Sequence, residues 1–270
     1  MQSFVQLEHW PCDNVAAAVV DQTGTIHRFG DTSRRFALAS VTKLLTAATV
    51  LLAVEEGSLS LDAADARGAT VADLLSHAAG LAPNGKVLDE PGRRRIYSNA
   101  GYDQVAEMVA TATELDFASY LNEGICQPFS MKSTALLTSP AFGAESTVDD
   151  LERFIRLLPQ LLAPPTHAAM TSPYLPELIG VLPGYGRQAP NPWGLGPEIR
   201  DQKSPHWTGT TNSTTTWGHF GQTGTFVWVD PAAQASCIVL TDRDFDAWAK
   251  PLWPAFSDAV LAELGVAEVT

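Results

Sequence analysis

Segments typical of β-strands lie at both ends of the chain, and helical patterns lie between them. Two short segments near the N-terminus and three near the C-terminus are rich in apolar or aromatic residues and are bounded by Gly, Pro and Asp. These segments are 15–20, 26–29, 216–220, 226–229 and 237–240. Because strands that follow one another usually pair, we expect the terminal segments to form one antiparallel sheet. The sequence therefore predicts an α+β fold with a mostly helical insertion and a closing helix at 247–264.

Helical patterns occupy the middle of the chain. In residues 38–54 apolar side chains recur every three or four positions, and Gly57 follows at a position typical of a helix end. Thr70 and Asp73 match a capping box, which starts another helix. Further helices are predicted at 102–112, 117–121 and 148–162.

A change of composition divides the chain. Residues 159–215 hold ten of the 18 prolines, and six of the nine residues from 208 to 216 are Thr, so loops and short turns are expected there. We therefore predict one discontinuous α/β domain, made of residues 1–57 and 190–270. Residues 58–189 form a second, mostly helical domain, and the active site is expected in the cleft between the two.

Charge and cysteine usage exclude several classes of protein. The 17 Lys and Arg against 30 Asp and Glu give a net charge of −13, which argues against nucleic-acid binding. The apolar run 44–54 is too short to span a bilayer, and no signal peptide is visible, so we expect a cytoplasmic protein without membrane contact. Cys12, Cys126 and Cys237 are far apart and predict free thiols. The His residues lack ligand spacing, so no metal site is expected.

The segment Ser40-Val-Thr-Lys43 is the first candidate for chemistry. Residues three apart share a helix face, so Lys43 can serve as the base for the Ser40 hydroxyl if burial lowers its pKa. The alternative is a solvated helix with a serine cap and a surface lysine. The motif alone favours this alternative.

Two further segments offer matching chemistry. In Tyr97-Ser-Asn99, the phenol can exchange a proton and the Asn amide can bind both a lysine and a substrate. In His219-Phe-Gly221-Gln-Thr-Gly224, Gly221 allows close approach of a substrate to a strand edge. Each segment alone is equally compatible with an ordinary turn.

The three motifs in this order resemble those of the serine β-lactamase and penicillin-binding protein family. The similarity is greatest to its class C-like branch, which includes DD-peptidases and carboxylesterases. It extends over residues 15–245, because flanking segments also match the family. These segments are Leu74–Leu81, Pro91–Tyr102, Trp193–Gly196, Trp217–Thr225 and Trp228–Pro231.

The resemblance implies a β-lactamase/transpeptidase-like fold and a serine nucleophile. By this match Ser40 forms the acyl-enzyme, Lys43 and Tyr97 exchange its proton, and Asn99 binds Lys43 and the substrate. Which group is the base at each step stays open, because Lys43 and Tyr97 would titrate as a coupled pair. The resemblance implies no cofactor and no metal.

The resemblance also implies a substrate side of the site. His219 stands where many β-lactamases have Lys, and Gly221 and Asn99 join it in binding substrate. The backbone N–H groups of Ser40 and Gln222 would form the oxyanion hole.

A neutral His219 is a weaker anchor for a substrate carboxylate than an ammonium group. Penicillins and D-Ala-D-Ala peptides carry this carboxylate, whereas simple esters do not. We therefore expect a hydrolase of small esters, with a D-alanyl-D-alanine-type peptidase or a β-lactamase as the alternative. A non-catalytic ligand-binding protein of the same fold is the third possibility, disfavoured by the intact Ser40, Lys43 and Tyr97.

Three other groups of residues receive structural interpretations. His77 is expected to be hydrogen-bonded near a helix end, and Arg93–Arg95 to form a solvated turn rather than a carboxylate anchor. Trp193, Trp207 and Trp217 could line the cleft or pack in the core, and core packing is favoured for Trp193 and Trp217.

Overall fold

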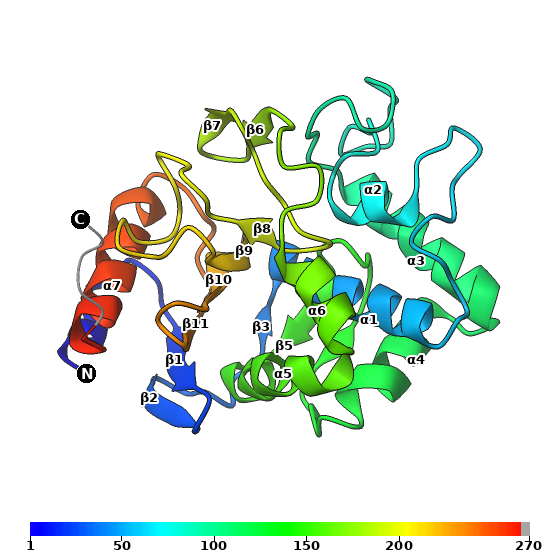
Figure 1. The fold of residues 1–270 in the computed structure, drawn as a ribbon. Helices are drawn as coiled ribbons and strands as arrows, with labels where there is room; N and C mark the ends of the chain where they lie inside the picture. The colour runs from blue at the N-terminus through cyan, green and yellow to red at the C-terminus, as the bar shows by residue number, and fades with distance from the viewer. Residues whose placement is uncertain (266–270) are drawn as a thin grey trace.

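The computed structural model describes residues 1–265, so the last five residues of the range 190–270 lie outside it. Within this part of the chain the main sheet has six strands in the order β2-β1-β11-β10-β9-β8, and each neighbouring pair is antiparallel. The strands that begin and end the chain therefore lie side by side, and the predicted sheet is confirmed (Figure 1). The bounds are β1 (Val15–Asp21), β2 (Thr25–Phe29), β8 (Glu198–Ile199), β9 (Trp217–Gly221), β10 (Thr225–Asp230) and β11 (Ala235–Thr241).

Both faces of the sheet are covered, because side chains along a strand alternate between the faces. In β10, Phe226 and Trp228 pack with α7 (Ala249–Glu263) and with η1 (Gln2–His9), a 3-10 helix absent from the prediction. Val227 between them belongs to the core on the other face, which also contains residues of α1 (Thr42–Glu55) and α5 (Val148–Leu161). The sheet is therefore the middle layer of three (Figure 1).

The remaining elements are helices and short strands outside the main sheet. The capping box predicted at Thr70 and Asp73 is present, and the short helix α2 follows it. The proline-rich stretch holds one eight-residue helix and a hairpin that the sequence pattern did not predict. The bounds are α2 (Val71–Leu75), α3 (Asn99–Thr113), α4 (Phe117–Leu121), η3 (Asn122–Cys126), α6 (Pro164–Thr171), β3 (Phe36–Ala37), β4 (Ala135–Leu136), β5 (Ala144–Ser146), β6 (Gly180–Leu182) and β7 (Gly186–Gln188).

The turn between β9 and β10 is attached to the segment that precedes Ser40. Thr223 Oγ1 donates to the carbonyl of Ala37 at 2.7 Å, and Thr225 Oγ1 donates to that of Leu38 at 2.9 Å. A side chain at Gly221 would collide with the Leu38 carbonyl oxygen, so glycine is required for this approach. The end of β9 is thereby fixed beside the candidate nucleophile.

The prediction of a solvated turn is wrong for Arg95, which is only 2% exposed. Its guanidinium donates to four backbone carbonyls, those of Ser76, Tyr174, Leu175 and Asn191. Loops from three parts of the chain converge on this one side chain. The carbonyl oxygens satisfy the donors and so make the burial of the cation tolerable.

Candidate active site

Ser40 lies at a sharp change of backbone direction. It is in a 3-10 turn, η2 (Ala39–Val41), and α1 begins two residues after it. The predicted helix over 38–54 therefore starts later, at Thr42. Ala39 has a φ of 44°, in the left-handed region that residues with a Cβ rarely adopt. Such strain is typical of functional positions. Here it lies directly before Ser40.

Lys43 is fully buried in the first turn of α1 and makes three polar contacts. Its Nζ is 2.8 Å from Asn99 Oδ1, 2.8 Å from the carbonyl oxygen of Ala141 and 3.3 Å from Ser40 Oγ. All three partners are uncharged. The alternative of a surface lysine is excluded by this burial.

Tyr97 and Asn99 reach the same point from the start of α3. The Tyr97 hydroxyl donates to Ser40 Oγ at 2.7 Å. The Ser98 side chain between them caps α3 by accepting from the Gly101 N–H at 3.1 Å, and the Ser98 N–H donates to His77 Nδ1 at 3.2 Å. These bonds fix the direction in which Tyr97 and Asn99 leave the helix end.

Burial shifts the acid–base properties of these groups in opposite directions. Desolvation holds the pKa of the Lys43 ammonium well below its usual value, although the Asp103 carboxylate opposes this. Desolvation raises the pKa of the Tyr97 phenol, and the hydrogen bond to Ser40 only partly compensates. The site therefore favours a neutral amine and a neutral phenol beside the Ser40 hydroxyl.

His219 lies on β9, next to this cluster. Its Nδ1 is 2.7 Å from the carbonyl oxygen of Phe220, so Nδ1 carries the proton and donates it. Its buried Nε2 has no partner within residues 1–265. Desolvation is the main cause that lowers the pKa of His219 to about 3. The imidazole is thus neutral near pH 7, as the sequence suggested.

Gln222 follows the end of β9 and is attached to Phe245 by two bonds. Gln222 Nε2 donates to the Phe245 carbonyl at 3.1 Å, and the Phe245 N–H donates to the Gln222 carbonyl at 2.6 Å. These contacts use the side chain and the carbonyl of Gln222. The backbone N–H of Gln222 takes part in neither of these bonds.

A pocket of about 210 Å³ brings the predicted residues together. Two of the predicted site residues, Gly221 at the end of β9 and Lys43, are buried and are not among the described residues that line it. The pocket is lined by Ser40, Tyr97, Asn99, Leu182, Pro183, Trp193, Glu198, His219, Phe220 and Gln222. The residues from the three sequence motifs therefore converge on one small cavity.

A family model described as beta-lactamase matches residues 13–260. The chain belongs to the beta-lactamase family. Among curated proteins, none matches the sequence closely enough to count as a relative.

Solved structures agree with the family over nearly the whole chain. A beta-lactamase from Mycobacterium bovis is 50% identical, with a TM-score of 0.95, over 97% of this chain and 99% of that one. Simvastatin synthase from Aspergillus terreus is 18% identical with a TM-score of 0.77, over 97% of both chains. EstCE1, described as a hydrolase with promiscuous acyltransferase activity, is also 18% identical with a TM-score of 0.77, over 96% of both chains. The last two show the fold alone.

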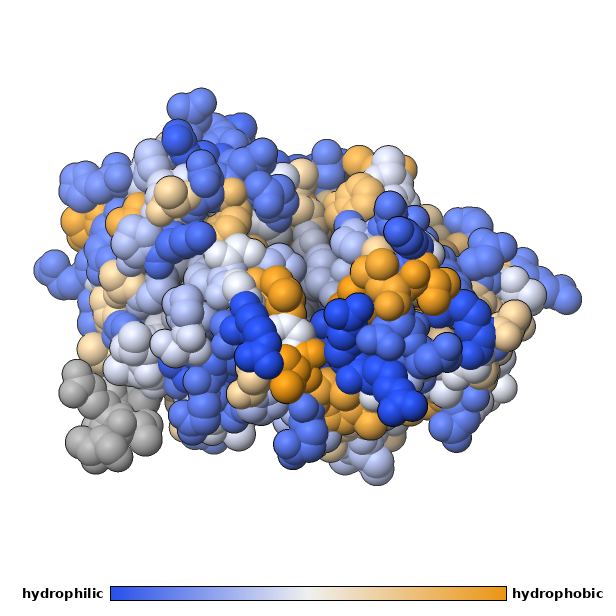
Figure 2. Space-filling model, turned by 90° about the horizontal axis from the view of Figure 1, so that it is seen from above, coloured by the Kyte–Doolittle hydropathy of each residue, from blue (hydrophilic) through white to orange (hydrophobic). Residues whose placement is uncertain are grey.

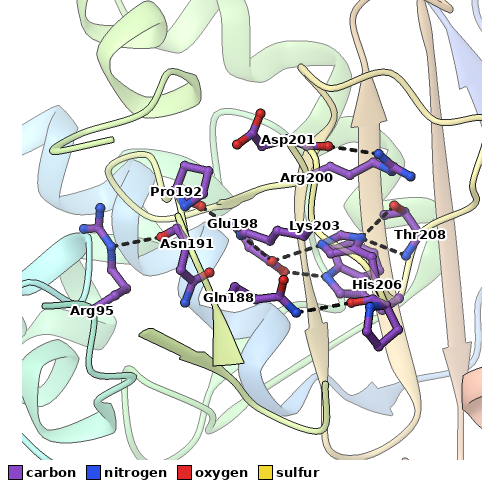
Figure 3. A network of polar contacts seen from close by, with 12 residues as sticks. Arg95, Gln188, Asn191, Pro192, Glu198, Arg200, Asp201, Lys203, His206 and Thr208 are labelled. Carbon is purple, nitrogen blue, oxygen red and sulfur yellow. Dashed lines mark hydrogen bonds and ion pairs between the residues drawn. The ribbon is translucent and has the colours of Figure 1, made fainter. Parts of the chain in front are cut away.

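This beta-lactamase-family chain has a buried ionic cluster in the pocket wall that the motifs did not predict. Glu198 on β8 accepts from Lys203 Nζ at 2.6 Å and contacts His206 Nε2 at 3.0 Å, and its other oxygen accepts from Trp207 Nε1 at 2.5 Å (Figure 3). Lys203 Nζ also donates to the Pro192 carbonyl at 2.9 Å. Desolvation alone would raise the pKa of Glu198, but the Lys203 charge and the contacts with Lys203 and His206 hold it far below its usual value. No sequence motif points to this cluster, since Glu198 lies on a two-residue strand and its partners are irregularly spaced in the loop that follows.

The three tryptophans weighed in the sequence all belong to the core, as was favoured for Trp193 and Trp217. Trp193 lines the pocket and contacts the rings of His77 and His219. His77 itself is buried beside Tyr97, with a ring distance of 4.5 Å, and accepts a backbone hydrogen bond near the end of α2, in agreement with its structural interpretation. Trp217 is in the core and Trp207 binds Glu198.

Within residues 1–265 the cysteines are free; Cys126 and Cys237 are buried and Cys12 is half-buried. The same part of the chain holds no group of three or more His, Cys, Asp or Glu side chains arranged to bind a metal ion. No helix in it is both long and apolar enough to cross a bilayer.

Proposed function

We propose that the protein is a serine hydrolase that cleaves small esters through an acyl-enzyme on Ser40. The observation that carries this proposal is the position of Ser40 Oγ, 2.7 Å from the Tyr97 hydroxyl and 3.3 Å from Lys43 Nζ. A nucleophile between two proton-exchanging groups is the arrangement that acyl transfer requires.

The hydrogen bonds indicate which group accepts the proton of Ser40. A neutral amine has two N–H groups, which match the two carbonyl-type oxygens of Asn99 and Ala141. Its lone pair then faces Ser40, whose hydroxyl can donate to it while accepting from Tyr97. Lys43 is therefore assigned as the base of acylation, and Tyr97 as a donor in the resting enzyme.

The reaction follows in two steps. Ser40 Oγ bonds to the ester carbonyl carbon as its proton moves to Lys43, and the C–O bond to the alcohol then breaks. The departing oxygen takes a proton from Lys43 directly or through Tyr97. In the second step water attacks the acyl carbonyl carbon and gives a proton to the base. The bond from that carbon to Ser40 Oγ then breaks, and Ser40 Oγ recovers a proton as the carboxylic acid leaves. The backbone N–H groups of Ser40 and Gln222 are assigned to the oxyanion, which is consistent with the bonds that hold Gln222.

The charges around the pocket support an ester rather than a carboxylate-bearing substrate. His219 is neutral, and Phe220 offers only hydrocarbon. No Lys or Arg is among the described residues that line the pocket, whereas the Glu198 carboxylate is. An anionic group placed there would meet no free cation, because Lys203 in the pocket wall is already paired with Glu198.

In this proposal the site lies between the two predicted parts of the chain. Ser40, His219 and Gln222 come from residues 1–57 and 190–270, whereas Tyr97 and Asn99 come from residues 58–189. Neither part alone contains the whole proton path, because Ser40 and Lys43 lie in one part and Tyr97 lies in the other.

The second candidate is hydrolysis of β-lactams, or of D-alanyl-D-alanine-type peptides. It is favoured by one observation, the 50% identity to a protein described as a beta-lactamase. A non-catalytic binding role is disfavoured because Ser40, Lys43 and Tyr97 are in hydrogen-bond contact.

Intact-protein mass spectrometry after brief exposure to p-nitrophenyl butyrate or to benzylpenicillin distinguishes these candidates. We expect release of nitrophenol with turnover and no durable penicillin adduct. A durable or rapidly hydrolysed penicillin adduct that Ser40→Ala abolishes would favour the second candidate. If neither compound forms an adduct with the protein and neither is hydrolysed, the binding role is favoured. Ser40→Ala with an unchanged melting temperature is the matched control.

A further inference from the structure

A second hollow adjoins the Ser40 pocket and is mostly apolar. It has a volume of about 460 Å³ and shares Tyr97 and Pro183 with the pocket. Its other apolar residues come from the loop before α3 and from β6. They are Pro83, Leu88, Ile96 and Val181. We call this hollow the outer groove.

Strand β6 lies between the two hollows and contributes side chains to both. Side chains alternate along a strand, and accordingly Leu182 lines the Ser40 pocket while Val181 lines the outer groove. Val181 is 59% exposed, and Leu88 across the groove is 46% exposed. Val87 and Ile179 beside them are also exposed, so apolar side chains gather at this rim. Figure 2 looks onto this face and shows apolar patches interrupting the hydrophilic surface.

The floor of the outer groove is held in place by Arg95. β6 bridges to the backbone of Arg95 at Gly180, and a side chain at Gly180 would collide with the Arg95 carbonyl. The Arg95 guanidinium meanwhile binds four carbonyls of the surrounding loops, one of them that of Asn191 (Figure 3). The groove is therefore formed before any ligand arrives, so binding needs little ordering of the chain.

The charges at the groove are already neutralised. Arg94 pairs with Asp89 at 2.8 Å, and Arg95 is buried among its carbonyls. Neither arginine therefore presents an unpaired charge to a ligand. The lining thus suits a hydrocarbon chain better than an ionic group.

We propose that the outer groove binds the acyl chain of the ester, so that the substrates are esters of medium-length, unbranched fatty acids. The chain would leave the carbonyl at Ser40, pass between Tyr97 and Pro183 and lie against Val181 and Leu88. This inference rests on the proposed function, whose ester hydrolysis supplies the bond to be broken. It names the acid part of the substrate.

The kinetic test compares p-nitrophenyl acetate with p-nitrophenyl octanoate below its micelle concentration. Partial burial of the six added methylenes in this open groove is expected to raise kcat/KM by about 1.5-fold for each, so octanoate should exceed acetate by about tenfold or more. In Val181→Glu this octanoate-to-acetate ratio should fall by about tenfold, because a carboxylate then borders the chain. Equal rates for the two esters, or an unchanged ratio in Val181→Glu, would overturn the proposal.

Val5→Glu is the matched control, since it makes the same chemical change at a side chain that is 48% exposed on η1. The N-terminus lies beside α7, away from β6 and β7 (Figure 1). We expect the ratio in Val5→Glu to equal that of the unmodified protein. A fall in both variants would mean that added charge, and not the groove, changes the ratio.

A binding measurement separates failure of the groove from failure of the proposed function. Calorimetric titration of Ser40→Ala with octanamide and acetamide needs no turnover. Octanamide should bind about tenfold more tightly, and Val181→Glu added to Ser40→Ala should remove the difference. If no ester acylates Ser40 but octanamide shows this pattern, the function fails and the groove stands. If octanamide binds no better than acetamide, the groove proposal is overturned whatever the esters do.

Discussion

Two lysines of this protein are almost completely buried near the same pocket, and their partners differ. Lys43 contacts three uncharged oxygens, those of Ser40, Asn99 and Ala141. Lys203 contacts the Glu198 carboxylate at 2.6 Å as well as a carbonyl. Burial lowers the pKa of both, but only Lys203 has a neighbouring carboxylate in contact that opposes the shift. The first lysine is thus free to lose its proton, whereas the second is kept charged.

The difference teaches how one fold gives the same side chain two roles. A buried ammonium without an anion is unstable as a cation and becomes a base near neutral pH. A buried ammonium with a carboxylate is part of a pair that must stay intact. Four substitutions or conditions test this contrast.

The largest effect is expected for Lys43→Met. Loss of the base should lower kcat/KM for p-nitrophenyl butyrate by about 10⁴-fold, as for other members of a catalytic set. The free energy of unfolding should stay the same or increase, because a costly buried amine is replaced by hydrocarbon. Steady-state kinetics and urea unfolding measure the two quantities. A rate within tenfold of the original would remove Lys43 from the mechanism.

For Lys203→Met the expected effect is on stability. Removing one partner leaves the Glu198 charge buried and unpaired, which should lower the free energy of unfolding by about 3–5 kcal/mol. Adding Glu198→Gln should restore most of the loss, since the remaining pair is uncharged. The same urea transitions measure both variants. Equal stability of the single variant and the original would contradict the structural role of this pair.

A smaller effect is expected when a cation is placed in the pocket. His219→Lys supplies an ammonium group where the neutral imidazole now lies. The ratio of benzylpenicillin acylation to butyrate acylation should rise by about tenfold, because the penicillin carboxylate gains a charged partner. His219→Gln, which adds no charge, is the control. If Gln raises the ratio as much as Lys does, size and not charge governs selection.

The smallest effect is expected from pH. The rate of acylation should rise with pH through the lowered pKa of Lys43 and level off well below the usual lysine value of 10.5. No inflection from His219 is expected near pH 6.5, since its pKa lies at about 3. A pH profile of kcat/KM measures both. A rate that rises up to pH 10.5 would show that Lys43 keeps an ordinary pKa.

The same shift predicts a sign for stability. Between the folded pKa of Lys43 and 10.5, the unfolded chain binds a proton that the folded chain does not, so stability should rise with pH. Lys203 has a lowered pKa too and contributes in the same direction. Glu198 acts at acid pH: its stabilising contribution is present above its ordinary pKa and is lost as pH falls through its lowered folded value. Urea unfolding of Lys43→Met should lack the first contribution.

Much of the fold could be predicted because its signals are local. The strand segments carry Val and aromatic residues between turns, and the single antiparallel sheet formed by the two ends of the chain was expected, although its sixth strand, β8, was not. The capping box at Thr70 was correct for the same reason. The convergence of Ser40, Lys43, Tyr97 and Asn99 was also expected, because the motifs recur together in a known family.

The remaining features depend on contacts between distant segments. Nothing in the run Arg93–Arg95 shows that carbonyls from 76, 174–175 and 191 will surround the third arginine. The Glu198–Lys203 pair likewise has no periodicity to reveal it. The tautomer of His219 is set by a backbone carbonyl, which no side-chain pattern specifies.

The attachment of the β9–β10 turn to residues 37–38 has a consequence for diversification. The bonds that join this turn to residues 37–38 involve no residue of the outer groove, whereas Ser40, the proposed nucleophile, also accepts a hydrogen bond from Tyr97, which lines that groove. Rim residues such as Leu88 and Val181 can therefore change without breaking the bonds that hold the turn beside Ser40. A scaffold built this way can acquire new substrates by exchanging its rim while its reactive atom stays in place.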